Sequence, residues 1–324
     1  MSITTVSNLS VRDSLTTALQ SEQARLSTLT TQLSSGVKYD DLTDYTSSEA
    51  RNYVNLQAAA SQKQSYVKII SSVNNTLSIY DTTLTDLEEI VTQAKTLGNN
   101  NPTYNEDVAL NVRTQAESYL KSVTVDLNQS INGRYVYSGS RYTTPPVQDL
   151  SELPESTLTS TLTTGYEVPS YDTEYVALGG VTSEASYTTD NAPIDTNYRI
   201  DYGITSNDPA FQKMIAGLRY LQAAGNSTDT ATYSTNMTEA VSLLTEALSA
   251  IQLMHTTVAS NMNIVDSEKS SQETAISNFA DQIADIQQVD TTQVSTEITA
   301  LETTLQASYT VTGDLLKMSL INYL

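Results

Sequence analysis

The sequence predicts a mainly α-helical protein in which both chain ends form a long antiparallel coiled-coil helical bundle, with a small β-rich inserted domain at the centre. Apolar residues recur at alternating spacings of three and four within residues 66–94, 108–131 and 237–286. This spacing is typical of helices that pack along a shared seam. Between Tyr142 and Tyr198 there is no Lys or Arg, and six of the seven prolines lie between 145 and 209. The middle of the chain is therefore expected to fold differently from its ends.

These patterns divide the chain into five expected segments. An N-terminal helix occupies residues 1–40, and the N-terminal part of the helical bundle occupies residues 41–137. The acidic β-rich insert follows at 138–208, where Thr, Ser and Tyr dominate and Gly and Pro interrupt short β-favouring runs. Residues 209–288 return as the C-terminal part of the bundle, and 289–324 form a C-terminal helix.

The first helix is expected from leucines that share one face near the start of the chain, where Glu22 interrupts the stripe. Gly36 has the position of a helix C-cap. Thr46 and Glu49 have the spacing of a capping box, so a second helix should begin there. The leucines of the first stripe are Leu15, Leu19, Leu26, Leu29 and Leu33.

The next two helices are expected to form an antiparallel hairpin. The segment "LGNNNP" between them supplies a glycine stop, polar residues and Pro102. The seam before it contains Tyr66, Ile70, Val73, Leu77, Tyr80, Leu84, Leu87, Val91 and Ala94. The seam after it contains Val108, Val112, Ala116, Leu120, Val123, Leu127 and Ile131.

A third and longer seam is expected in the C-terminal half, with His255 as a polar residue that sets its register. The sequence contains no second His and no Cys that could complete a metal site with it. The members of this seam are Met237, Val241, Leu244, Leu248, Ile251, His255, Val258, Met262 and Val265, followed by Ile276, Phe279, Ile283 and Ile286.

The last segment carries an apolar stripe that continues into the final residues. Chain ends are normally polar and frayed, so an apolar end indicates a surface that a partner covers. The stripe contains Val294, Ile298, Leu301, Leu305 and Leu315, and then Leu320, Ile321, Tyr323 and Leu324.

Composition excludes several classes of protein. The 324 residues carry a formal net charge of -21, which disfavours nucleic acid and anionic membranes as partners. No apolar run is long enough to span a bilayer, and the first twenty residues lack the features of a secretory signal. The absence of cysteine removes disulfides, thiolate catalysis and cysteine metal sites.

Candidate catalytic and metal-binding residues are sparse as well. Asp40, Asp41 and Asp44 supply oxygen ligands, but without the spacing and central glycine of a calcium loop, so a solvated loop is the better interpretation. No serine has a nearby histidine to activate it. The sequence therefore predicts no enzyme, no cofactor and no metal.

Two segments resemble bacterial flagellin-type axial proteins. The first is "LSTLTTQLSSGVKYDDLTDYTSSEARN", whose Leu33 to Lys38 stretch, with Gly36, is similar to the family's L-S-S-G-x-K turn. The second is the ending "LQASYTVTGDLLKMSLINYL", which is similar to the A-x-Y-x-V-T and S-L-x-x-Y-L elements of many flagellins. Together these motifs cover the two helical arms. In one departure, "GVKYDDLTDY" replaces the usual N-x-A-x-D-D-x-A-G pattern.

A third segment resembles one branch of the family, the hook–filament junction proteins known as hook-associated protein 3. Junction proteins of this type carry an N-G-R-Y-x-F-x-G element, and "INGRYVYSG" at 131–139 is similar to it. The matching positions are Gly133, Arg134, Tyr135, Tyr137 in the Phe position, and Gly139. No motif was matched in the central acidic segment.

The resemblance implies a structural subunit of the bacterial flagellum, located outside the cell and exported without a cleavable signal peptide. It implies pairing of the two terminal helices as an assembly interface that neighbouring subunits bury. The implied partners are further copies of the chain and other axial proteins (flagellin and hook-associated proteins), with the flagellar export machinery and a chaperone before assembly. Neither nucleic acid nor membrane is implied.

Two alternatives stay open beside the hook–filament adaptor. The chain could be the filament flagellin itself, the subunit of the motility filament. More remotely, it could be a cell-surface adhesin, because tyrosines clustered on a β surface can stack on sugars.

Overall fold

The computed structural model describes residues 3–139, 142–143, 145–153 and 190–321, with the backbone alone for 3–12 and 315–321. Much of the predicted insert, 154–189, and the last three residues lie outside this description. The chain divides into two units, which are described separately. Unit 1 contains Met1–Gln62 and Ala275–Leu324, and unit 2 contains Lys63–Thr274.

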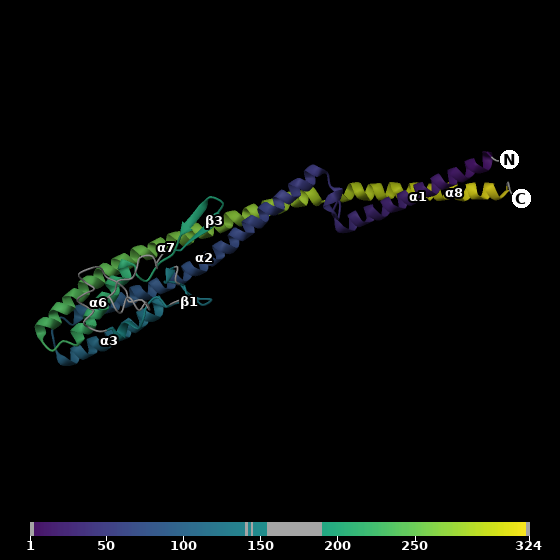
Figure 1. The fold of residues 1–324 in the computed structure, drawn as a ribbon. Coiled ribbons are helices and arrows are strands. Elements are labelled where there is room, and N and C mark those ends of the chain that lie inside the picture. Colours follow the sequence, from purple (N-terminus) through teal and green to yellow (C-terminus); the bar gives the residue numbers. More distant parts are fainter. Residues whose placement is uncertain (1–2, 140–141, 144, 154–189, 322–324) are drawn as a thin grey trace. The chain divides into compact units, whose positions relative to one another are not determined.

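Unit 1 is built on two antiparallel helices, α1 (Ile3–Ser35) and α8 (Thr291–Ile321), which lie side by side in Figure 1. The short helix η1 (Leu42–Asp44), the start of α2 (Ser47–Asn100) and the end of α7 (Thr230–Gln287) complete it. The two chain ends lie at the same end of the pair (Figure 1).

The joints of unit 1 follow the predicted caps. Gly36 has a φ of 72°, a left-handed conformation that glycine adopts without a side-chain clash, and α1 ends just before it. At the start of α2, the backbone N–H of Glu49 donates to Thr46 Oγ1 over 3.3 Å, and the N–H of Thr46 donates to Glu49 Oε2 over 3.2 Å. These reciprocal bonds form the expected capping box.

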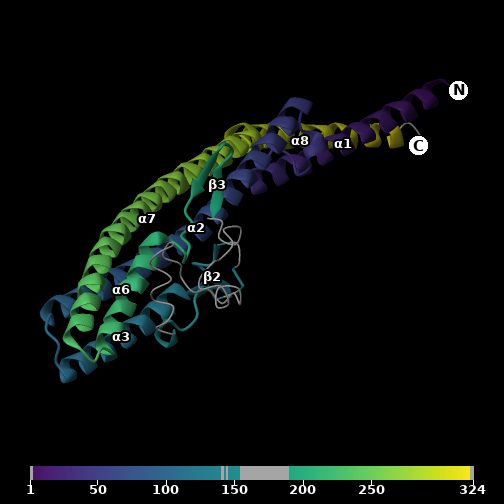
Figure 2. The ribbon, with the colours of Figure 1, turned by 60° about the vertical axis from the view of Figure 1, so that its left-hand side comes forward.

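Unit 2 is a helical bundle of α2, α3 (Glu106–Leu127), α6 (Pro209–Gly225) and α7, seen side by side in Figure 2. Two small antiparallel hairpins accompany it. One pairs β1 (Ser130–Ile131) with β2 (Arg134–Tyr135), and the other pairs β3 (Asn191–Asp195) with β4 (Tyr198–Asp201). A short helix, η3 (Leu150–Glu152), also belongs to this unit.

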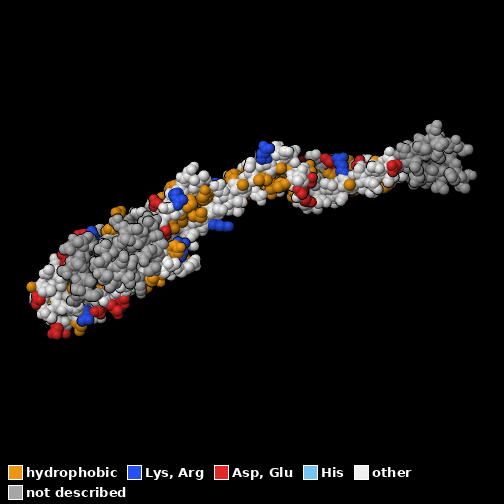
Figure 3. Space-filling view, in the orientation of Figure 1, with side chains coloured by type: hydrophobic (Ala, Val, Ile, Leu, Met, Phe, Trp, Pro, Cys, Tyr) orange, Lys and Arg blue, Asp and Glu red, His pale blue; other side chains and the backbone are white. Residues whose placement is uncertain are grey.

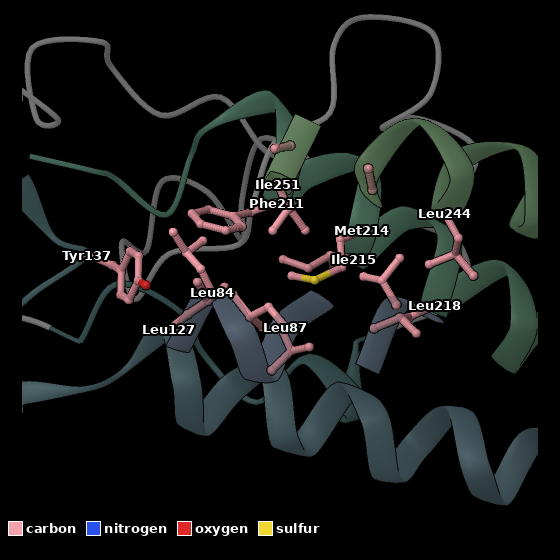
Figure 4. Packing of buried hydrophobic residues seen from close by; sticks show 14 of the residues in the cluster. Leu84, Leu87, Leu127, Tyr137, Phe211, Met214, Ile215, Leu218, Leu244 and Ile251 are labelled. Carbon is pink, nitrogen blue, oxygen red and sulfur yellow. The ribbon is translucent and has the colours of Figure 1, made fainter. Parts of the chain in front are cut away.

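The core of unit 2 is one cluster to which α2, α3, α6, α7 and both hairpin regions contribute. The three expected seams supply about half of its buried side chains. Figure 4 shows Leu84 and Leu87 meeting Phe211 and Met214 in the space between the helices. The expected fold class, a long helical bundle with a β part in its middle, is confirmed.

Two helices differ from the expectation. Gly98 does not end α2, which continues to Asn100. Instead, a Cβ at Gly98 would lie 2.6 Å from Val241 Cγ2, so this glycine permits close packing of α2 on α7. Helix α6 was not foreseen as a separate element. Asp208 caps it by accepting from the N–H of Ala210 over 2.8 Å, and Pro209 occupies its first position.

Hydroxyl groups on the long helices bond to their own backbone. Thr30 Oγ1 donates to the carbonyl of Leu26 over 2.7 Å in α1, and Thr303 Oγ1 donates to the carbonyl of Thr299 over 2.9 Å in α8. The same i to i−4 bond recurs at other threonines of both helices. The described face of unit 1 that is visible in Figure 3 is largely white, the colour of uncharged polar side chains and backbone, with hydrophobic side chains between.

Candidate assembly site

The terminal helix pair, α1 with α8, brings together the residues predicted for its seam. Four of these side chains are buried and form the centre of a separate hydrophobic cluster, namely Leu29, Val294, Leu301 and Leu305. Leu19, Leu26 and Ile298 pack against them and are partly buried, as is Val289. The three-and-four spacing therefore identified the contact surface of both helices correctly, although a role for it in assembly stays a prediction.

Other predicted interface residues are less enclosed or lie outside the description. Leu15 is half-buried, and Leu33 keeps 38% of its surface exposed. The side chains of Leu315, Leu320 and Ile321 are not among those described, and neither are Tyr323 and Leu324.

Polar contacts fix the alignment of the pair. Arg25 Nη2 lies 3.3 Å from Glu297 Oε2, and the side-chain amide of Gln23 donates to the hydroxyl of Tyr309. Both partners of the ion pair are solvent-exposed, so it contributes at most about 1 kcal/mol to stability. Glu22 interrupts the seam as expected, and its Oε2 atom is buried without a hydrogen-bond partner among the described residues.

Unit 1 leaves a set of large apolar side chains exposed, which two helices cannot cover on all sides. Val311 is 53% exposed and Tyr309 is 49% exposed, both on the described part of α8. The others are Leu33, Tyr39, Leu42 and Val54. Spacing alone did not single out most of these positions, because they lie outside the three-and-four stripe.

The segment that resembles the junction proteins forms a tight hairpin. Asn132 and Gly133 occupy its two turn positions with φ of 51° and 78°. Positive φ at both positions is the requirement of a type I′ turn, which explains the Asn-Gly pair. The guanidinium of Arg134 stacks 4.3 Å from the ring centroid of Tyr142, and Gly139 also has a positive φ of 56°.

Tyr137 anchors this segment in the core of unit 2. Its side chain is fully buried, and its ring meets Tyr80 edge-on at 5.0 Å and Phe211 at 5.6 Å. Its hydroxyl forms a short hydrogen bond with Thr83 Oγ1. The backbone takes part too, because the N–H of Ser206 donates to the carbonyl of Tyr137 over 2.9 Å.

Tyr80 ties the same segment to the chain that returns from the centre. Its hydroxyl donates to the carbonyl of Val136 over 2.8 Å and accepts from the N–H of Ile204 over 3.2 Å. Burial raises the pKa of Tyr80 well above its usual value, so the phenol stays protonated and able to donate. The motif is thus a structural clasp between α2 and the loop before α6.

His255 lies at the edge of the seam and contacts two carboxylates of α2. Its Nδ1 atom is 2.8 Å from Glu88 Oε1, and its Nε2 atom is 2.9 Å from Asp81 Oδ1. It is therefore partly exposed and hydrogen-bonded to two carboxylates, where the sequence indicated a position inside the apolar seam.

Reactive arrangements are sparse in the described part of the chain. There, no group of three or more His, Cys, Asp or Glu could hold a metal ion. Asp41 in the acidic loop accepts from the N–H of Thr43 over 2.9 Å, which caps η1 and lowers the pKa of its carboxyl. No described helix combines the length and the hydropathy needed to cross a membrane.

Two hollows in unit 2 offer little chemistry. One of about 410 Å³ lies beside α7 and has Tyr202, Asp208 and Leu253 in its lining. The other, of about 190 Å³, lies beside the β1–β2 hairpin and includes Arg134 and Asp190. Burial raises the pKa of both aspartates, but neither of these linings pairs a nucleophile with a base.

The chain is a mainly helical protein, with paired terminal helices in unit 1 and a helical bundle with a buried hairpin segment in unit 2. Solved structures of similar fold exist. No protein-family model matches the sequence, and no curated protein sequence matches it either. A protein from Vibrio parahaemolyticus assigned as a flagellar hook-associated protein superposes with a TM-score of 0.56 at 12% identity, covering 76% of this chain and 100% of that one.

The second similar structure is FlgL from Bacillus cereus. It has a TM-score of 0.53 at 17% identity, covering 72% of this chain and 100% of that one. The chain thus has the fold of flagellar hook-associated proteins, and the expected likeness to the hook–filament junction type is confirmed at the level of fold.

Proposed function

We propose that this protein is a structural subunit of the bacterial flagellum, the adaptor that joins the hook to the filament. The observation that carries the proposal is the shared fold, which extends over the whole of both flagellar chains. The chain works by packing against other subunits and has no catalytic role. Its place is outside the cell, on the flagellum, after export without a cleaved signal.

The terminal helix pair is the assembly surface in this proposal. The apolar side chains between α1 and α8 are buried, while Val311, Tyr309 and Leu33 stay exposed in the single chain. Covering such side chains stabilises an assembly, since burying one large apolar side chain contributes about 1.5–3 kcal/mol. The partners are further copies of this chain, flagellin and other hook-associated proteins, with the export machinery and a chaperone acting before assembly.

The described part of the surface can be tested by placing a charge at an exposed position. Val311→Asp should leave the melting of the isolated protein unchanged, because the side chain already contacts water. The same substitution should block incorporation into flagella, since a carboxylate would have to be buried unpaired. Val311→Thr is the matched control, which keeps the branched shape without a charge. Normal flagella containing the aspartate variant would exclude this face from the assembly surface.

Deletion of the gene separates the adaptor from the filament flagellin. Electron microscopy of cells without this protein should show bare hooks, with flagellin monomers released into the medium. Hooks that carry only a short stub would instead identify the protein as the filament flagellin. Intact filaments with a loss of surface binding would favour the adhesin.

A further inference from the structure

The single histidine of the chain connects the two longest helices of the bundle. His255 projects from α7 between Asp81 and Glu88, which lie two turns apart on α2. Both ring nitrogens are within 3 Å of a carboxylate oxygen, at 2.8 Å and 2.9 Å. About a quarter of the imidazole side chain is exposed, at 26%.

The hydrogen-bond pattern determines the protonation state of this ring. An ionised carboxylate only accepts hydrogen bonds, whereas a neutral imidazole has one N–H donor and one acceptor nitrogen. A neutral ring would therefore place a nitrogen lone pair against a carboxylate on one of its two sides. The imidazolium form satisfies both contacts, because each of its nitrogens carries a proton.

We propose that His255 is a proton-operated clip, which holds α2 and α7 together as an imidazolium and opens as the pH rises. Release of the proton leaves one carboxylate facing a nitrogen lone pair. The bundle should then lose stability on the alkaline side, without any change in its apolar core.

The surrounding charges agree with this assignment. On α2, residues 81–88 contain no Lys or Arg, and Asp86 interacts with Asp126 of α3. On α7, residues 247–265 contain no charged side chain besides His255 itself. Burial alone lowers the pKa of His255, but the hydrogen bonds and charges of Asp81 and Glu88 outweigh it, and the pKa lies above its usual value.

The sign of the pH effect follows from this raised pKa. A group that binds its proton more tightly in the folded state contributes its full stability below the pKa of the unfolded chain, about 6.5 for histidine. That contribution is lost as the pH rises through the higher folded value. The clip should be closed below about pH 6.5 and should open on the alkaline side of that value.

Nuclear magnetic resonance can follow the clip directly, because the ring signals come from one histidine. In the folded protein, the ring should titrate above pH 6.5, with both nitrogens protonated below the midpoint of that titration. Asp81→Asn and Glu88→Gln should each lower the midpoint of this titration. A tenfold change in proton affinity corresponds to about 1.4 kcal/mol of coupling. A folded-state midpoint at or below 6.5 would overturn the proposal.

A second measurement compares the pH dependence of stability in matched variants. From pH 6 to pH 9, the denaturation midpoint of the wild-type protein should fall more than that of His255→Gln, which cannot titrate. Lys213→Gln is the control, because it removes the 2.9 Å ion pair of Lys213 with Glu246 but no group that titrates near neutral pH. Equal slopes in the wild type and His255→Gln would refute the clip, and the ring titration needs no variant should this one fail to fold.

Discussion

Replacing Tyr137 by alanine should destabilise unit 2 severely. The ring is fully buried and makes edge-on contacts with Tyr80 and Phe211 at 5.0 and 5.6 Å. Truncating a buried aromatic side chain to alanine costs about 3–5 kcal/mol, and a well-packed site that cannot collapse lies at the upper end. Since whole domains are stable by about 5–15 kcal/mol, this single change removes a third or more of a typical value.

Tyr137→Phe separates the contribution of the ring from that of the hydroxyl. Loss of the hydroxyl leaves Thr83 Oγ1 still donating to the carbonyl of Ile79 over 2.9 Å, so no buried donor is orphaned. The expected cost is about 1 kcal/mol. For a unit of this size, each kcal/mol shifts the melting temperature by about 2–4 °C, so the two variants should differ clearly.

Denaturant unfolding followed by circular dichroism at 222 nm measures both variants. Alanine should lower the unfolding free energy several times more than phenylalanine does. Equal costs for the two substitutions would show that Tyr137 is not an anchor and would refute the clasp inferred from its contacts.

Four further substitutions test backbone space and burial. Gly225→Ala should cost about 1–3 kcal/mol of unfolding free energy in a denaturation assay, because the new Cβ would lie 2.4 Å from Arg113 Cβ. Gly313→Ala should stabilise α8 by up to about 1 kcal/mol in the same assay, because nothing lies within 4 Å of the new Cβ. Gly133→Ala should cost about 1–2 kcal/mol through its positive φ alone, which thermal melting can check. Burial raises the pKa of Asp126 to about 6. The contribution of this group to the unfolding free energy should therefore fall as the pH rises from about 4 to about 6. Asp126→Asn should remove that fall and stabilise the protein by about 1 kcal/mol at pH 7, a value reduced for its half-exposed position; an unchanged pH profile of denaturation midpoints would contradict this assignment.

The sequence predicted the parts of the fold that depend on local spacing. Seam residues such as Leu84 and Leu301 were identified because helical periodicity is visible within each segment. The cap of α2 at Thr46 was predicted for the same reason, since a capping box spans only four residues. The Asn132–Gly133 turn was not predicted, but the preference of type I′ turns for Asn-Gly explains it.

Features that depend on the relative positions of distant segments were not predictable in this way. The stagger of α2 against α7 decides that His255 meets Asp81 and Glu88, and no local pattern encodes it. The exposure of Val311 likewise depends on how much of α8 a single neighbouring helix can cover. Helix α6 has a recognisable start at Asp208 and Pro209 and lies within the expected bundle segment 209–288, but it was not predicted as a separate helix.

The threonines of the terminal helix pair have a consequence for how such a surface can be buried. A polar group that loses water without gaining a hydrogen bond costs about 1–3 kcal/mol. Thr30 and Thr303 already donate within their own helices, to the carbonyls of Leu26 and Thr299. Their hydroxyl protons need no acceptor on a neighbour, and their methyl groups remain free to make van der Waals contact. A face that is hydrophilic by composition can thus be dehydrated at low cost, which allows one sequence to stay dispersed as a monomer and still pack closely against another chain.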